Sequence, residues 1–373
     1  MELEILRGCD KIGENLIEVR GEGVRVLIEC GTALEPSEQG ERIERAILKK
    51  HYDATVITHL HPDHAGLLRT PLNADKIYMG EATYRILCHL GAICKENTHR
   101  VCVFYSEEPF LVGDIEIIPH LCDHSAYDSY MIEIRHKDKV ALYTGDFRFS
   151  GRKGQGRLLS RLPREVDLLI CEGTRGESYC SKSEYDLERE ALKIMKNHKR
   201  VFFMASATNA DRIVTLYKAT LRSGGIFLLD DRCGEICELC KGIPTPNYSH
   251  CHAFFTHKVD RKRHERARAR YSLVGKAQIA KMERFTMRVG SYMLDYLRSL
   301  NDLSSLRGSV LIYSMWQGYK QSEQMSAFLY GVREIGIEVV DLHISGHADK
   351  GAIERLIDTL RPKRTIFVHR EIK

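Results

Sequence analysis

Residues 58–64 read THLHPDH, and this stretch decides the fold. Three histidines and one aspartate fall within seven positions: His59, His61, Asp63 and His64. The preceding residues, ATVI at 54–57, predict a buried strand, and two residues spaced by two at its end can point the same way. Neutral imidazoles and a carboxylate at this density suit a borderline metal such as zinc. The stretch therefore predicts a metal site, with a solvated histidine-rich turn as the alternative.

Length and composition set the class of protein. The 373 residues are 43% apolar and 29% charged, which is typical of a globular chain of two domains. Neither a run of about 18 apolar residues nor an export leader is recognisable, so we expect a cytoplasmic protein with no membrane segment. Twelve scattered cysteines are expected to be reduced thiols. The net charge of +5 permits a polyanionic partner without requiring one.

The pattern of strands and helices changes near residue 172. Before that point, β-branched runs separated by turns predict a sheet packed on a sheet, flanked by helices. After it, helices alternate with strands, as in βαβ units of a parallel sheet. The strands expected in the first half are residues 24–30, 54–60, 114–121, 129–135, 139–146 and 166–173.

Two later segments carry further candidate ligands. His124 lies in LCDHSAYDSY and Asp146 in LYTGDFR, each at the end of a predicted strand. A carboxylate in the Gly-Asp turn after an apolar strand could bridge two ions about 3.5–4 Å apart. Taken singly, each residue would be an ordinary turn residue.

The ordered series HLHPDH, His124 and Asp146 resembles the metallo-β-lactamase family. The resemblance implies an αβ/βα sandwich with metals at one edge. That family usually carries an aspartate at the end of an early strand, and here the stretch IECGT places Glu29 at this position.

The second half resembles the β-CASP nucleases of that fold, which include ribonuclease J and the mRNA 3′-end cleavage nucleases. Glu172 in LLICEGTRGE, His347 in HISGHADKG and His369 in TIFVHREIK match their motifs A, B and C. Members with histidine in motif C usually act on RNA, so His369 favours RNA. The resemblance implies a core at residues 1–175 and 335–373, with a β-CASP domain of parallel α/β type inserted at 176–334.

The resemblance also implies a role for each motif residue. One ion would be held by His59, His61 and His124, and the other by Asp63, His64 and His369, with Asp146 bridging. Asp63 and Asp146 would position the attacking hydroxide. Glu172 would orient His347, whose imidazole would protonate the leaving oxygen. We expect two divalent ions, zinc first and manganese as the alternative.

Several residues are candidates for substrate contact. Residues 345–349 form a glycine-bearing helix entrance that can approach a phosphate, and the family usually has serine where this chain has Asp349, which is expected to cap the helix. Residues 258–271 contain seven Lys or Arg, which could contact a nucleic-acid backbone or form a solvated helix face. The candidates for substrate binding are Ser206, Ser345, Gly346, Arg261 and Arg263.

Two other features are expected to be structural. Cys233, Cys237 and Cys240 fall on one stripe of a predicted helix, where thiols pack as small apolar groups, and a structural zinc site is the minor alternative. Trp316 is the only tryptophan; we expect it in the core or a cleft wall, with base stacking as the alternative.

The sequence as a whole predicts a metal-dependent ribonuclease that hydrolyses RNA phosphodiester bonds with a hydroxide activated by two metals. The substrate is expected to be single-stranded. Cleavage could be internal, from the 5′ end, or both, and homodimerisation is left open. Two alternatives remain: a small-molecule hydrolase of the same fold, such as a lactonase or thioesterase, and a catalytically silent RNA-binding subunit.

Overall fold

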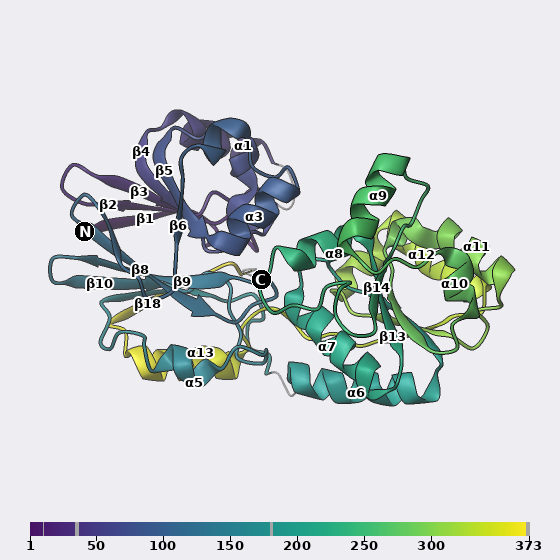
Figure 1. Cartoon of the computed structure of the whole chain (residues 1–373). Helices are drawn as coiled ribbons and strands as arrows, with labels where there is room; N and C mark the ends of the chain where they lie inside the picture. The colour runs from purple at the N-terminus through teal and green to yellow at the C-terminus, as the bar shows by residue number, and fades with distance from the viewer. Residues whose placement is uncertain (10, 34–36, 180–181, 371–373) are drawn as a thin grey trace. The chain divides into compact units, whose positions relative to one another are not determined.

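Two six-stranded sheets face each other in the first of the two units of this computed structural model, which describes residues 1–9, 11–33, 37–179 and 182–370 (Figure 1). The first unit comprises Met1–Ser181 and Gly346–Lys373. Its first sheet runs in the order β1 (Glu2–Arg7), β2 (Leu16–Arg20), β3 (Arg25–Ile28), β4 (Tyr52–Val56), β5 (Ala74–Gly80) and β6 (Val101–Phe104). Its second sheet runs in the order β18 (Arg364–Val368), β11 (Leu168–Glu172), β10 (Lys139–Tyr143), β9 (Ser129–His136), β8 (Ile115–Cys122) and β7 (Phe110–Val112).

Helices cover the outer faces of both sheets. Figure 1 shows α1 (Glu38–Lys49) and α3 (Glu81–His89) against the first sheet, and α5 (Gln155–Leu159) and α13 (Lys350–Leu360) against the second. One apolar core lies between the sheets, where Val26 and Val56 meet Ile132 and Ile170. Another lies between the second sheet and its helices. The four layers form the αβ/βα sandwich that the sequence predicts.

The topology brings several strand ends to one edge of this sandwich. β3 and β4 are parallel neighbours, and so are β10, β11 and β18. Parallel neighbours end at the same edge of a sheet. The register of β11 and β18 pairs Glu172 with Val368, so His369 follows directly beside the end of β11.

The second unit, Lys182–Ser345, contains a single parallel sheet. Its strand order is β14 (Cys251–Phe254), β13 (Ile226–Asp230), β15 (Phe285–Arg288), β12 (Arg200–Met204), β16 (Val310–Tyr313) and β17 (Glu338–Asp341). α11 (Leu294–Leu303) and α12 (Glu323–Glu334) pack on one face through a large apolar cluster. α6 (Glu184–Asn197) begins at a capping box of Ser183 and Asp186 and packs beside α7 (Ala210–Arg222).

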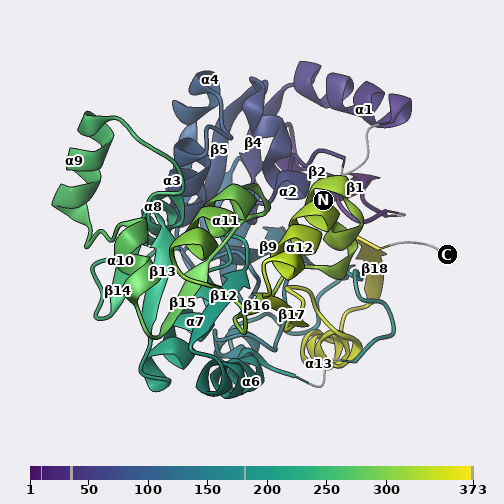
Figure 2. The same ribbon diagram turned by 90° about the vertical axis from the view of Figure 1, so that its right-hand side faces the viewer.

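One helix of the second unit has no buried residue. α9 (Arg261–Arg270) stands apart from the sheet in both views (Figures 1 and 2). Arg263 and Arg270 tie it to α8 (Asp231–Glu238) through ion pairs with Asp231 and Glu238.

Three details differ from the expectations drawn from the sequence. β5, β6 and β7 were not anticipated, and in β5 the exposed Asp75 and Lys76 interrupt the apolar pattern. The two units meet at 181/182 and 345/346, whereas the boundaries expected from the sequence lie at 175/176 and 334/335. β17 belongs to the second unit because it pairs with β16. Trp316 was expected in the core or a cleft wall, and its side chain is 63% exposed, which excludes the core.

Candidate metal centre

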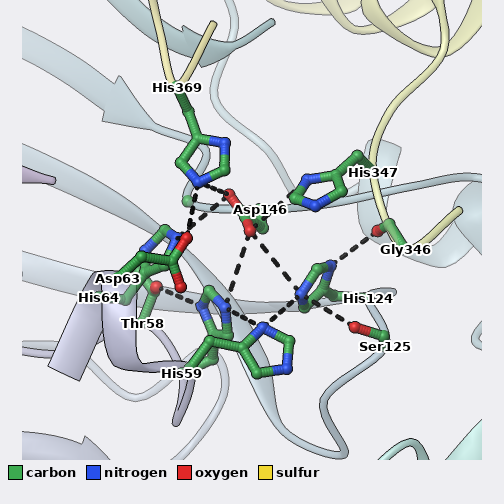
Figure 3. Close-up of polar contacts among 12 residues, drawn as sticks. Thr58, His59, Asp63, His64, His124, Ser125, Asp146, Gly346, His347 and His369 are labelled. Atoms are coloured by element: carbon green, nitrogen blue, oxygen red, sulfur yellow. Dashed lines mark hydrogen bonds and ion pairs between the residues drawn. The ribbon is translucent and has the colours of Figure 1, made fainter. Parts of the chain in front are cut away.

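Nine of the residues singled out from the sequence meet at the edge of the first unit. They come from the segments after β4, β8, β10 and β18, from the end of β11 and from the loop before α13. Figure 3 shows six of these side chains around Asp146, namely His59, Asp63, His64, His124, His347 and His369. The nine are His59, His61, Asp63, His64, His124, Asp146, Glu172, His347 and His369.

Three imidazoles form the first group of potential ligands. Nδ1 of His61 lies 3.1 Å from Nε2 of His59 and 3.1 Å from Nε2 of His124. Zinc binds imidazole nitrogen at about 2.0–2.1 Å in tetrahedral sites, which places two ligand atoms about 3.3 Å apart. Three ring nitrogens that face one another at this spacing fit a shared cation.

The second group is built from two imidazoles and a carboxylate. Oδ2 of Asp63 lies 2.9 Å from Nε2 of His369 and 3.7 Å from Nε2 of His64. These separations also bracket the spacing expected around one ion. His64 is completely buried, because α2 (Pro62–Ala65) turns it inward one turn after the strand ends.

Asp146 presents one oxygen to each group. Its Oδ2 lies 3.8 Å from Nε2 of His59 and 3.8 Å from Nε2 of His124. Its Oδ1 lies 3.3 Å from Nε2 of His64 and 3.8 Å from Nε2 of His369. Among the described residues, no donor satisfies the buried Oδ1 in hydrogen-bonding geometry. The carboxylate is thus placed as a bridge between two cations would be.

Buried acceptors hold the outer nitrogens of these rings. Nδ1–H of His64 donates to Oε1 of Glu29 at 2.9 Å, and Nδ1–H of His124 donates to the carbonyl of Gly346 at 2.7 Å. Such bonds keep one proton on Nδ1, so that Nε2 is the nitrogen that faces the other ligand atoms of each group. Glu29 therefore orients the imidazole of His64 from the side away from the other ligand atoms.

Two threonine hydroxyl groups each connect a histidine of the cluster to a buried glutamate, and sequence reasoning missed both threonines. Thr58 lies 2.9 Å from Nδ1 of His59 and donates to Glu29. Thr174 lies 2.7 Å from Nδ1 of His369 and donates to Oε2 of Glu172 at 2.7 Å. Their only sequence signal is proximity to the motifs THLHPDH and CEGT.

Asn15 was also missed. It is almost fully buried, and its Nδ2 lies 3.3 Å from Nε2 of His64. It belongs to the stretch GENLIEV near the N-terminus, whose spacing carries no metal-binding signature.

Two of the positioning residues adopt unusual backbone conformations. Glu29 has a φ of 66° and His369 a φ of 54°, both in the left-handed region. A non-glycine residue held there costs about 1–3 kcal/mol and is typically found at functional sites. The fold accepts this cost at the ends of β3 and β18, where both side chains turn into the cluster.

Charge sets the protonation of the metal-free site. Burial lowers the pKa of His59, His61 and His124, so these imidazoles are neutral. Burial has the same tendency at His64, but the carboxylates of Asp146, Asp63 and Glu29 outweigh it and raise the pKa of His64 well above its usual value. The two groups therefore differ in protonation. The three imidazoles of the first group are neutral and can bind a cation, whereas His64 of the second group holds a proton in the metal-free protein.

His347 lies beside both groups but is held differently. Its Nδ1–H donates to Oε2 of Glu172 at 3.0 Å. Burial opposes protonation, but the carboxylates of Glu172 and Asp146 raise the pKa of His347 to about 9. Its side chain is 24% exposed, whereas those of His59 and His64 are fully buried. The site thus includes one protonated imidazole that solvent can reach.

The residues expected to contact substrate are divided between the units. Gly346 lies in the first unit, where its carbonyl accepts from His124. Ser206, Ser345, Arg261 and Arg263 belong to the second unit. Ser206 forms a turn with Thr208 before α7, Arg261 pairs with Glu265 within α9, and Arg263 is engaged by Asp231.

Asp349 caps α13, as expected, by accepting from the backbone N–H of Ala352 at 2.7 Å. Cys233, Cys237 and Cys240 are all buried, but α8 ends at Glu238, so Cys240 lies just beyond the helix that was expected to carry all three. Among the described residues, every potential metal group lies in the cluster around Asp146 and His59, and the cysteines belong to none of them. No described helix is both long and apolar enough to cross a bilayer.

An αβ/βα sandwich with histidines and aspartates gathered at its strand ends defines a metal-dependent hydrolase class. The chain belongs to the metallo-beta-lactamase superfamily, whose family model matches residues 12–203. Residues 333–372 match a second model, described as the Zn-dependent metallo-hydrolase RNA specificity domain. These families imply binding of divalent metal.

Similar proteins include relatives named RNase J-like protein, ribonuclease J and transcription termination factor. An RNase J-like protein of Methanocaldococcus jannaschii is 28% identical over 243 residues, covering 58% of this chain and 54% of the relative. Ribonuclease J of Corynebacterium glutamicum is 23% identical over 403 residues, covering 100% of this chain and 54% of the relative. Transcription termination factor FttA of Thermococcus kodakarensis is 22% identical over 437 residues, covering 98% of this chain and 66% of the relative. The chain spans about half the length of the first two relatives.

The fold also matches a crystal structure of a protein of unknown function from Enterococcus faecalis V583. The TM-score is 0.79 at 18% identity, covering 99% of this chain and 93% of the other. The likeness at this identity concerns the fold alone.

Proposed function

We propose that the protein is a ribonuclease that hydrolyses phosphodiester bonds of single-stranded RNA with two divalent ions, zinc first and manganese as the alternative. The observation that carries the proposal is the position of His347, a partly exposed imidazole whose Nδ1 lies 3.0 Å from Oε2 of Glu172 and 3.5 Å from Oδ2 of Asp146. Hydrolysis of a phosphodiester requires charge neutralisation at the phosphate and a proton for the leaving oxygen. The match of residues 333–372 to an RNA specificity domain supports RNA as the substrate.

In this proposal His59, His61 and His124 would hold one ion, and Asp63, His64 and His369 would hold the other, with Asp146 available to both. Two divalent ions, when bound, lower the pKa of a water molecule toward about 7 and neutralise phosphate charge.

The chain's own groups do the rest. Asp63 and Asp146 orient the attacking oxygen in line with the bond that breaks. Nδ1 of His347 is held by Glu172, so Nε2–H is the end of the ring that can donate a proton to the leaving oxygen. Glu172 itself is fixed by the backbone N–H groups of Phe147 and Ala348, at 2.8 and 3.2 Å. These hydrogen bonds therefore fix the orientation of the His347 ring.

Labelled RNA tests the proposal. The purified protein is incubated with zinc or manganese and single-stranded RNA that carries a 5′-monophosphate or a 5′-triphosphate, and the products are sized on a gel. We expect cleavage that requires the metal. Released mononucleotides would assign a 5′-exonuclease, and discrete internal fragments an endonuclease.

Lactones and thioesters serve as the matched comparison. Turnover of these substrates together with complete failure on RNA would contradict the proposal and favour a small-molecule hydrolase. Light scattering of the same preparation determines whether the chain forms homodimers, a question that the sequence leaves open.

A further inference from the structure

Three exposed aromatic side chains follow neighbouring strand ends in the second unit. Tyr292 comes after β15, while Trp316 and Tyr319 come after β16. Their side chains are 56%, 63% and 51% exposed. β15 and β16 flank β12 in the sheet, and the register pairs Arg288 with Phe203 and Tyr313 with Met204. These three residues, here termed the aromatic edge, therefore lie at the carboxyl edge of three adjacent strands.

Two of these rings are seated on glycines. A Cβ atom at Gly318 would lie 2.1 Å from Cη2 of Trp316, and a Cβ atom at Gly290 would lie 2.4 Å from Cε1 of Tyr292. Any larger residue at either glycine would displace the ring. The backbone N–H of Tyr319 and the hydroxyl of Tyr313 both donate to the carbonyl of Trp316, at 3.2 and 3.1 Å. Gly290 and Gly318 thus let the two rings lie close against the backbone, and two hydrogen bonds fix the carbonyl of Trp316.

The position of the aromatic edge is where open α/β sheets bind ligands. β12 continues through α7 to β13, on the β15 side, whereas β16 continues through α12 to β17, on the other side. The carboxyl ends of β12 and β16 therefore flank the point at which the strand order reverses. Trp316 follows one of these ends and Ser206 the other.

Charge favours an anionic ligand. The second unit, residues 182–345, contains 26 Lys and Arg against 18 Asp and Glu, a net charge of +8, although the whole chain carries only +5. Among the described residues, no ion pair engages Lys262, Arg266 or Arg268 of α9. Proteins bind single-stranded nucleic acid by combining positive charge, which attracts the phosphates, with aromatic rings, on which the bases stack. The second unit carries both.

We propose that the aromatic edge stacks on the nucleobases of a single-stranded nucleic acid, with Trp316 and Tyr292 as the principal platforms. The inference rests on the proposed function for the choice of RNA as ligand. Tyr319 meets Trp316 edge to face, with ring centroids 5.4 Å apart and planes at 89°. It supports the indole from the side.

The single tryptophan makes its own probe, because all indole emission comes from Trp316. The protein is titrated with a 2′-O-methyl oligoadenylate of about 12 nucleotides, which supplies bases and resists cleavage, and separately with inorganic polyphosphate, which supplies charge alone. Stacking predicts saturable quenching of the emission by the oligonucleotide and none by polyphosphate. Equal quenching by both ligands would overturn the inference.

Affinity is measured independently by the anisotropy of the labelled oligonucleotide. Trp316→Ala and Tyr292→Ala should each weaken binding roughly 5- to 150-fold, the range for loss of one stacked base. Trp316→Phe should stay near the parent because it keeps an aromatic face. Tyr330→Ala is the matched control, since Tyr330 is 65% exposed on α12, away from the strand ends. Thermal unfolding verifies that each variant is folded.

Two results separate this inference from the proposed function. If the parent cleaves RNA but Trp316→Ala and Tyr292→Ala bind and cleave as the parent does, the inference fails and the function stands. If no RNA is cleaved but binding still depends on both rings, the function fails and the inference stands. Conversion of an oligomer to a monomer by Trp316→Ala, with unchanged affinity for the oligonucleotide, would assign the surface to self-association and overturn the inference.

Discussion

Nδ1 of His64 lies 2.9 Å from Oε1 of Glu29, and both side chains are fully buried. Glu29 also accepts from the backbone N–H of Thr58 at 3.1 Å, so one carboxylate orients two segments of the cluster. The buried carboxylate of Glu29 therefore fixes the orientation of the His64 imidazole.

Replacement of Glu29 by Gln should weaken metal binding about 10- to 100-fold, because the amide turns a donor toward groups that already donate. Competition with a chelator measures the affinity. Glu133→Gln is the control, since Glu133 is equally buried and lies 2.7 Å from Nε2 of His120. Equal metal affinity in the two variants would contradict the role of Glu29.

Removal of the Thr174 hydroxyl should weaken metal binding at the site that contains His369 and leave the other site unchanged. Thr174→Val keeps the shape but frees Nδ1 of His369, so one of two bound ions should be lost about 10- to 100-fold more easily. Thr174→Ser keeps the hydroxyl and should resemble the parent. Metal titration followed by calorimetry distinguishes two sites from one, and identical titrations of the two variants would show that the hydroxyl is dispensable.

His347→Ala should retain both ions but lose about 10²- to 10⁴-fold in the rate of RNA cleavage, as expected when a general acid is removed. Bis(p-nitrophenyl) phosphate provides the contrast, because p-nitrophenolate departs without a proton. We expect a loss below about 10-fold on this substrate. Equal losses on both substrates would show that His347 does not serve as the acid.

Metal binding should depend on pH differently at the two sites. His64 must lose a proton before Nε2 can bind a cation, and its raised pKa means that the metal-free protein holds this proton at neutral pH. Affinity at the second site should therefore rise about 10-fold per pH unit below that pKa. The lowered pKa values of His59, His61 and His124 predict a flat profile between about pH 6 and 8 at the first site.

Calorimetry in two buffers of different ionisation enthalpy counts the protons released. About one proton should accompany the second ion and none the first. The reverse order of release would refute the assignment of protonation states.

Local patterns were sufficient for part of this site. The strand ATVI and the spacing in THLHPDH place four residues within one short segment, so the cluster could be predicted from neighbouring positions. His369 joins them only because β18 pairs with β11, a contact between segments nearly two hundred residues apart that no local pattern specifies. Only the resemblance to a known family anticipated it.

Other features were beyond sequence reasoning for physical reasons. Thr58 and Thr174 contribute a hydroxyl whose partner depends on the geometry of the finished site, and threonine is common in strands and turns. Trp316 was expected in the core or a cleft wall because aromatic side chains usually bury a large area. Its exposure depends on the turn at Gly318, which holds the indole on the surface.

The most direct test of the central claim measures metal content and RNA cleavage on the same preparation of the parent and of Asp146→Asn. Because Asp146 offers one oxygen to each group of ligands, the parent should carry two divalent ions per chain and cleave single-stranded RNA. Asp146→Asn should carry at most about one ion and lose at least about 10³-fold in rate. Asp128→Asn, which changes a buried carboxylate outside the site, should keep both ions. Two bound ions and undiminished cleavage in Asp146→Asn would contradict the account.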